Sequence, residues 1–152
     1  MKNYILACFL TAAVACNNTH NNESTTENNS AIPQTASDSL YKAVLDGHDT
    51  GMAKMKEISG LQALVKQQRD SINNLKVKAS SNIADYDTAY SDLEQAKKLM
   101  NDWMHDFEPD NAGTTEDEKL GFYRKEKEKI DTVNARINSS IEKAKEITAA
   151  KP

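Results

Sequence analysis

The chain has 152 residues, and its 19 Lys and Arg against 23 Asp and Glu give a formal net charge of −4. This balance argues against a nucleic-acid partner, because proteins that bind nucleic acids usually carry a clear basic excess. With 5 Gly, 3 Pro and 2 Cys, the composition also excludes collagen-like and disulfide-framed proteins. The length is that of one domain.

The first 15 residues have the pattern of a secretory signal peptide. Lys2 is followed by an apolar run, residues 4–15, which is shorter than the roughly 20 residues that a permanent spanning helix needs. The run ends in Ala13-Val14-Ala15-Cys16, which resembles the lipobox of bacterial lipoproteins. In that motif the cysteine is lipidated and becomes the new N-terminus, so we expect acyl chains on Cys16. The alternative is ordinary cleavage near Cys16 and release of the protein.

Two further observations favour Cys16 as the lipid-attachment site. Cys8 is a weaker candidate, because only four apolar residues precede it. Once residues 1–15 are removed, Cys16 is the one remaining cysteine, and a free thiol in an exported protein would otherwise need an explanation. We therefore expect a membrane-anchored protein of the cell envelope that faces the periplasm, with the choice between inner and outer membrane left open.

The lipidated cysteine and a disordered polar tether are expected to occupy residues 16–37. This stretch is rich in Asn, Thr, Ser and Glu, and such a composition cannot bury enough apolar surface to fold. From residue 38 to residue 152 the pattern changes to that of a helical bundle.

The first predicted helix covers about residues 38–76, with Ser37 as its N-cap. Apolar residues, and one histidine, recur at an average step of 3.5, which is typical of an amphipathic helix. They are Leu40, Val44, His48, Met52, Met55, Ile58, Leu61, Val65, Ile72 and Leu75. Each glycine in a helix costs roughly 1 kcal/mol relative to alanine, so we expect a bend or break at Ser59-Gly60.

The second predicted helix covers about residues 82–107, after a turn at residues 76–82. Its core stripe alternates steps of three and four, as on the packed face of a coiled coil. The stripe is Ile83, Tyr86, Tyr90, Leu93, Lys97, Met100, Met104 and Phe107. Pro109 then ends the helix.

The third predicted helix covers about residues 115–149. Thr115 and Glu118 have the spacing of a capping box, and the Lys/Glu-rich stretch 124–129 is expected to be a solvated face. No stretch shows the alternation of a strand. We therefore predict an all-α fold, an antiparallel three-helix bundle of long helices.

One cluster of side chains stands out as a candidate binding site. Two short stretches hold all the methionines after the signal peptide, the one tryptophan and two of the three histidines. A hairpin about residue 80 places Met55 opposite His105 and brings the cluster to one end of the bundle. Its members are His48, Met52, Met55, Met100, Trp103, Met104 and His105.

The cluster has two interpretations. The first is packing, because the four methionines occupy predicted core positions and methionine fills irregular gaps in cores. The second is a site for a soft metal such as Cu(I), since thioether and imidazole ligands suit that ion, or for a small hydrophobic ligand. Packing is the interpretation we favour, and no cofactor is expected.

Three stretches of the chain resemble a family of small lipoproteins from the Bacteroidota. They begin at His48-Asp49, at Asp102-Trp103-Met104 and at Tyr123, and together they span about residues 38–147. Members are often labelled "viral A-type inclusion protein", a label that reflects coiled-coil similarity. The resemblance implies a lipoprotein with a helical bundle, and it leaves the function open because the family has no established activity. Gly47 and Gly51 depart from the more helix-favouring residues of the family.

Three functional hypotheses follow. The leading one is a non-catalytic structural or interaction module, held to the membrane by its acyl chains, that binds a protein partner or forms a homodimer. The second is the metal or small-ligand site at the cluster. The third, an enzyme, is not expected, because no catalytic motif is found and the adjacent pairs His48-Asp49 and His105-Asp106 point in different directions on a helix.

Overall fold

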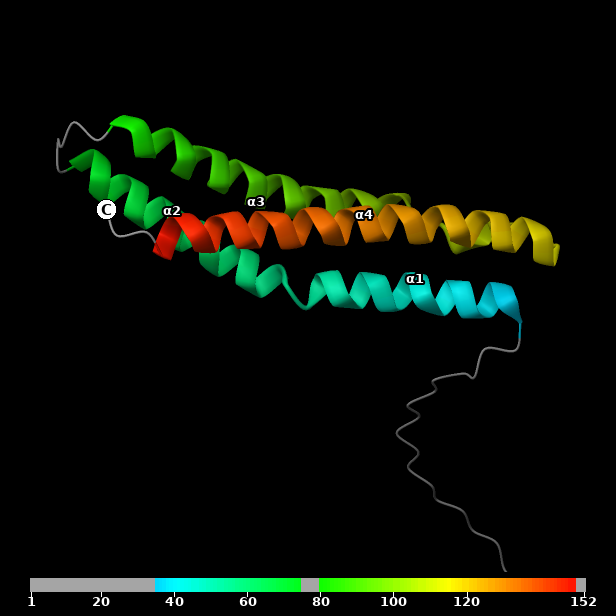
Figure 1. The fold of residues 1–152 in the computed structure, drawn as a ribbon. Coiled ribbons are helices and arrows are strands. Elements are labelled where there is room, and N and C mark those ends of the chain that lie inside the picture. Colours follow the sequence, from blue (N-terminus) through cyan, green and yellow to red (C-terminus); the bar gives the residue numbers. More distant parts are fainter. Residues whose placement is uncertain (1–34, 75–79, 150–152) are drawn as a thin grey trace, which may run out of the picture. The chain divides into compact units, whose positions relative to one another are not determined.

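The computed structural model describes residues 35–74 and 80–149. These residues form four α-helices: α1 (Ala36–Met52), α2 (Met55–Asn74), α3 (Ser80–Asp106) and α4 (Glu116–Ala149). A short 3₁₀ helix, η1 (Pro109–Ala112), connects α3 to α4. The described residues contain no β-strand, so the predicted all-α class is confirmed (Figure 1).

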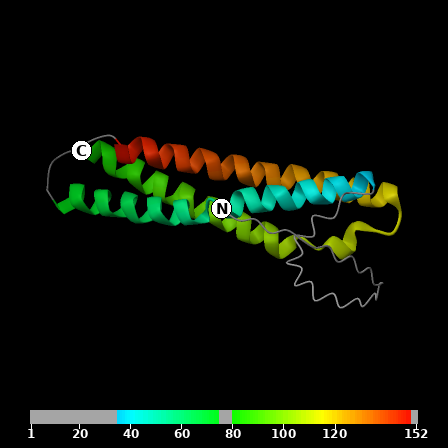
Figure 2. The ribbon, with the colours of Figure 1, turned by 90° about the horizontal axis from the view of Figure 1, so that it is seen from below.

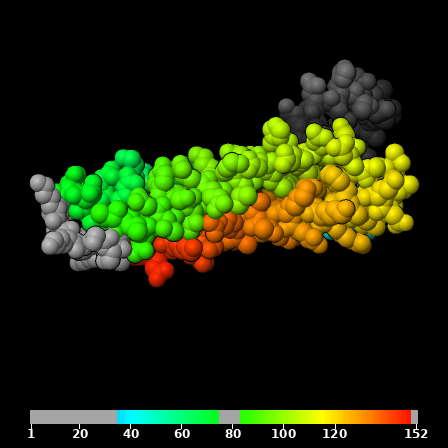
Figure 3. Space-filling view, turned by 90° about the horizontal axis from the view of Figure 1, so that it is seen from above, coloured from blue at the N-terminus to red at the C-terminus, as the bar shows by residue number. Residues whose placement is uncertain are grey.

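The helices pack as a three-helix bundle whose first helix is divided in two. Along the chain, α1 and α2 run in the same direction as α4, while α3 runs in the opposite direction (Figures 1 and 2). Helix α4 contacts all three other helices, whereas α1 and α3 contact each other only sparsely. On one face of the molecule α3 and α4 lie side by side (Figure 3). The predicted bundle is confirmed, with α4 as its central element.

The core runs the length of the bundle. Its fully buried large side chains come from every helix: Val44, Ile58, Val65, Leu93, Met100, Ile130 and Ile137. Burial of apolar surface at roughly 25 cal/mol per Å² makes this core the main source of stability. We find no helix among the described residues with the length and hydrophobicity that crossing a bilayer requires.

Two helices begin earlier than predicted. Thr35, not Ser37, is the N-cap of α1, since its hydroxyl accepts from the amide of Asp38 and its own amide donates to that carboxylate. Ser37 is instead a buried residue of the first turn, and its amide and hydroxyl donate to the Glu116 carboxylate at 2.9 and 2.7 Å. Helix α3 begins at Ser80, inside the predicted turn. The predicted signal peptide, Cys16 and the tether up to residue 34 lie outside the described residues.

The capping box that starts the last helix is confirmed. The Glu118 carboxylate accepts from the amides of Thr114 and Thr115, both at 3.0 Å, and Thr115 Oγ1 accepts from the Glu118 amide. These hydrogen bonds lower the pKa of Glu118 below its usual value. Helix α4 therefore starts at Glu116, within one residue of the expected position.

The first helix breaks at Ala53 and Lys54. The Lys54 amide donates to the carbonyl of Gly51 at 3.0 Å, which tightens the last turn of α1, and the Lys54 carbonyl then accepts the amide of Ile58 at the start of α2. The break lies where the packing partner changes along the first helix of the bundle. Helix α1 packs mainly on α4, whereas α2 packs mainly on α3.

The predicted bend at Ser59-Gly60 is therefore wrong. Both residues lie within α2. A Cβ atom at Gly60 would have no neighbour within 4 Å, so this glycine only weakens the helix by roughly 1 kcal/mol, which the packing of α2 tolerates.

Gly47 and Gly51 allow α1 to approach α4 closely. A Cβ atom at Gly51 would lie 2.1 Å from Met100 Cε and 2.6 Å from Asn134 Oδ1. At Gly47 it would lie 3.0 Å from Ile130 Cγ2, and the Gly47 carbonyl accepts from Asn134 Nδ2 at 2.8 Å. The two glycines thus lie on the face of α1 that packs against α4.

Candidate functional site

The aromatic residues gather at the end of the bundle where α1 begins. Tyr41 of α1 lies 5.1 Å from the ring of Tyr123 and 6.5 Å from that of Phe107. The Phe107 ring stacks on Trp103 at 4.8 Å and lies 6.3 Å from Phe122. Burial raises the pKa of Tyr123, which keeps its hydroxyl neutral. The rings fill the space between the sparsely contacting α1 and α3 and fix Trp103 in place.

Trp103 is held from α4 by a buried carboxylate. Its side chain is only 7% exposed, and its Nε1–H donates to Glu126 Oε2 at 3.1 Å. The other oxygen, Glu126 Oε1, accepts from Lys129 Nζ at 2.7 Å. Glu126 is 5% exposed, so the prediction that stretch 124–129 is entirely solvated is wrong at this position. A buried charge is tolerated when it is paired and hydrogen-bonded, as here.

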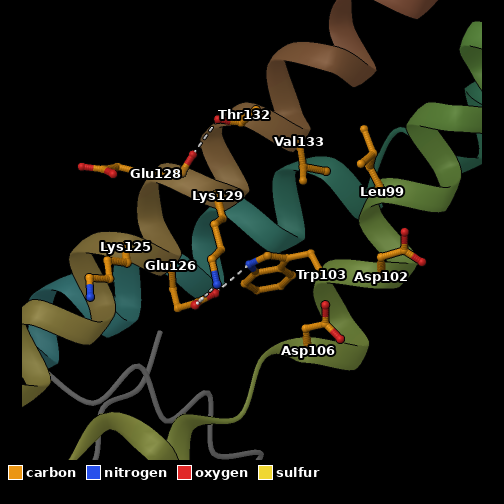
Figure 4. A pocket seen from close by; sticks show the side chains of 10 residues that line it. All are labelled: Leu99, Asp102, Trp103, Asp106, Lys125, Glu126, Glu128, Lys129, Thr132 and Val133. Carbon is orange, nitrogen blue, oxygen red and sulfur yellow. Dashed lines mark hydrogen bonds and ion pairs between the residues drawn. The ribbon is translucent and has the colours of Figure 1, made fainter.

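A groove of about 570 Å³ lies over this pair, between α3 and α4. Its apolar lining comes from Leu99, Trp103 and Val133. Charged and polar side chains complete it: Asp102, Asp106, Lys125, Glu126, Glu128, Lys129 and Thr132 (Figure 4). The sequence analysis identified only Trp103 among these residues.

A second feature lies on the other side of Trp103, along the line where α1 meets α3. The His48 ring lies 5.8 Å from the ring of Trp103. Met52 of α1 and Met104 of α3 are 39% and 37% exposed, and Leu45 is 37% exposed. We call His48, Met52 and Met104 the seam residues, because His48 faces Trp103 across this line and Met52 and Met104 lie one helical turn from His48 and Met100 on their own helices. Two of the four methionines therefore do not occupy the core positions predicted for them.

The structure divides the predicted cluster. Contacting residues of α1 and α3 have numbers that add to 148–151, as in Tyr41 with Phe107 (which directly follows α3), His48 with Trp103 and Gly51 with Met100. The predicted pairing of Met55 with His105 is therefore wrong. Met100 is fully buried and Met55 packs partly against the core.

The side chain of His105 is 89% exposed. The expectation that the adjacent His and Asp side chains point in different directions is wrong, because Nδ1 of His48 lies 3.0 Å from Asp49 Oδ1 and Nδ1 of His105 lies 3.2 Å from Asp106 Oδ1.

The phase of the α3 stripe explains why Met104 is exposed. The buried positions are Tyr86, Ala89, Leu93, Ala96, Met100 and Trp103. The predicted stripe also contains Tyr86, Leu93 and Met100. Between these residues it places Tyr90, Lys97 and Met104, whereas the structure buries Ala89, Ala96 and Trp103. The small side chains of Ala89 and Ala96 turn this face of α3 toward α4, which leaves Lys97 and Met104 outside.

Known types of site do not account for these features. Among the described residues, no three His, Cys, Asp or Glu side chains are grouped so that they would hold a metal ion. No protein-family model matches the chain, and comparisons with curated proteins and with solved structures find no significant match. The function therefore has to be argued from the groove and the seam.

Proposed function

We propose that this protein is a non-catalytic binding module of the cell envelope, anchored by acyl chains on Cys16, that holds a partner protein in the α3–α4 groove. The groove is the observation that supports this proposal. Leu99, Trp103 and Val133 provide an apolar floor for one or two side chains of a bound segment. Aromatic anchors of this kind carry much of the binding energy at protein interfaces.

The charge of the groove favours a basic segment. Four carboxylates and two lysines line it, which is a net charge of −2. Lys129 is already paired with Glu126 at 2.7 Å, so its charge is largely neutralised by the protein itself. Asp106 and Glu128 are exposed and can face a ligand's Lys or Arg, although Asp106 also lies 3.2 Å from the exposed His105. We therefore infer a partner segment that combines apolar residues with Lys or Arg.

Site-specific photocrosslinking in intact cells tests the groove. A crosslinking amino acid at Thr132, an exposed residue of the groove, is expected to give an adduct with one protein. The same amino acid at Leu64, which is exposed on α2 and outside the groove, is the control. Adducts shared by both positions would contradict a specific groove, and an adduct with a second copy of this chain would replace the proposed partner with a homodimer.

Charge reversal tests the chemistry of the partner. The purified partner is expected to bind the full chain and to lose affinity after Glu128→Lys and Asp106→Lys, more strongly at low salt because the interaction is screened. Glu94→Lys, on an exposed part of α3 outside this groove, is the matched control. Equal effects at Glu94 and Glu128 would refute recognition of a basic segment by the groove.

The anchor is tested separately from the groove. In the native host, Cys16→Ser is expected to abolish labelling by a fatty-acid analogue and to move the protein out of the membrane fraction. A single acyl chain gives only marginal membrane binding, so stable association requires the several chains of a processed lipoprotein. Retention of the label in Cys16→Ser would refute Cys16 as the attachment site.

A further inference from the structure

The seam residues present three soft metal ligands on the surface of the bundle. His48 and Met52 lie one turn apart on α1, and Met104 lies on α3. Met52 and Met104 are more than a third exposed, so they are not among the buried residues of the core. Packing, which accounts for Met100 and for the partly buried Met55, therefore does not account for these two thioethers.

The antiparallel arrangement directs the two thioethers toward each other. With the numbers of contacting residues adding to 148–151, Met104 lies level with residues 44–47 of α1. Met52 is then displaced from it by five to eight residues, or about 7.5–12 Å along the axis. Side chains on a helix lean toward its N-terminus. Because α1 and α3 run in opposite directions, Met52 and Met104 lean into the interval between them, where His48 lies.

The face that each residue occupies agrees with this convergence. On α1, Gly51 faces Met100 and α4, and His48 faces Trp103 of α3. Met52 follows His48 by four residues and so shares its face. On α3, Met104 follows Met100 by four residues and thus lies over the same edge of the seam. Met52 and Met104 are 39% and 37% exposed, so this part of the seam is open to solvent.

The histidine is oriented by a neighbouring carboxylate. His48 Nδ1 lies 3.0 Å from Asp49 Oδ1, a contact that places the proton on Nδ1 and leaves the Nε2 lone pair free for a ligand. Metal-binding histidines are commonly oriented in this way by a carboxylate. The indole of Trp103 beside the imidazole adds a π face that attracts cations.

From this arrangement we propose that His48, Met52 and Met104 form a three-coordinate site for a soft monovalent metal ion, Cu(I) or Ag(I), beside Trp103. Thioether donors favour such soft ions, imidazole suits copper, and neither is a preferred ligand of Mg²⁺ or Ca²⁺. The site is independent of the α3–α4 groove, since none of its three ligands lines that groove. A lipid-anchored protein that also carries this site binds or buffers a soft metal ion at the membrane surface.

The test is titration of the lipidated chain, purified in mild detergent, with Ag(I). Binding is expected to quench the fluorescence of Trp103, the one tryptophan of the chain, and to add the mass of one silver ion in native mass spectrometry. Met52→Leu and Met104→Leu keep size and hydrophobicity while they remove the thioether. Each is expected to weaken binding by at least about tenfold, as loss of metal-site residues does, with unchanged helical circular dichroism.

A matched control is provided by the other histidine that has an adjacent carboxylate. His105 Nδ1 lies 3.2 Å from Asp106 Oδ1, a pairing like that of His48, but His105 lies outside the seam and is almost fully exposed. His105→Asn is expected to bind Ag(I) like the unsubstituted chain, whereas His48→Asn is not. The proposal is overturned if saturable one-to-one binding is absent. It is also overturned if binding persists in the Met52→Leu/Met104→Leu double variant, or if His105→Asn abolishes it.

Discussion

The close approach of α1 to α4 makes Gly51 the most informative position for a substitution. Alanine is a better helix former than glycine by roughly 1 kcal/mol, so a Gly→Ala change in a helix stabilises the fold unless the new methyl group meets an obstacle. At Gly51 that methyl would lie 2.1 Å from Met100 Cε, 2.6 Å from Asn134 Oδ1 and 3.4 Å from Ile137 Cδ1. Two of these distances are far shorter than van der Waals contact.

The magnitude follows from what has to move. Met100 is fully buried, so its terminal methyl cannot simply swing into solvent, and overpacking of this kind costs about 1–3 kcal/mol. Displacing the Asn134 amide also weakens its hydrogen bond to the Gly47 carbonyl, which is a further cost of about 1 kcal/mol. After the helix-propensity gain of roughly 1 kcal/mol is subtracted, we expect Gly51→Ala to lower the free energy of unfolding by about 1–3 kcal/mol.

Urea unfolding followed by circular dichroism at 222 nm measures this effect. Gly60→Ala and Gly121→Ala make the same chemical change at helical positions where a Cβ atom meets nothing within 4 Å. Both are expected to raise the free energy of unfolding by about 0.5–1 kcal/mol. If Gly51→Ala stabilises the protein as much as Gly60→Ala does, the close contact of α1 with Met100 and Asn134 is refuted.

Three more predictions concern polar contacts. Glu126→Ala leaves the buried Trp103 N–H unpaired, so we expect a loss of about 1–3 kcal/mol in urea unfolding and a shifted fluorescence maximum, while Glu126→Gln retains most of the stability. Hydrogen bonds from Ser37 lower the pKa of Glu116 below its usual 4.5; the resulting stabilisation is present above pH 4.5 and lost as the pH falls through the lowered value. Glu116→Gln should therefore flatten the acid unfolding curve in that range. Asp92→Ala removes a carboxylate that accepts from two cations of α4, and we expect a loss of about 1 kcal/mol that shrinks in 1 M salt.

Local signals predicted most of the fold. Thr115 and Glu118 predicted the start of α4 to within one residue, since a capping box involves only four neighbouring residues. Pro109 marked the end of α3 in the same local way. Heptad spacing predicted that three amphipathic segments pack together. Each of these signals is encoded within one turn or one helix face, so no knowledge of the neighbouring helices was required.

The break in the first helix was missed because it depends on a neighbouring helix. Gly47, Gly51 and Gly60 have the same intrinsic helix propensity, so a sequence gives no local reason to prefer one over another. The structure distinguishes them by what lies opposite: Asn134 and Met100 at Gly51, and solvent at Gly60. Tertiary contacts thus decide which glycine is required and which is merely tolerated.

The buried carboxylate was missed for a different reason, although the sequence held a signal. In α4 the apolar residues Tyr123, Ile130 and Ile137 are spaced by seven, and a heptad stripe also needs a residue three positions after each. After Ile130 that residue is Val133, but after Tyr123 it is Glu126. A charged residue at a predicted core position can be buried only when it has polar partners, and here these are Trp103 and Lys129.

The same choice of helix face in α3 produces both candidate sites. Because Ala89 and Ala96 turn toward α4, Trp103 is carried into the space above Glu126, where it forms the floor of the groove. The rotation that buries Trp103 moves Met104 out to the α1–α3 seam, where it is 37% exposed. Had the stripe through Lys97 and Met104 been buried instead, Trp103 would lie outside and neither site would form. The two small alanines therefore determine the surface chemistry of the bundle as well as its packing.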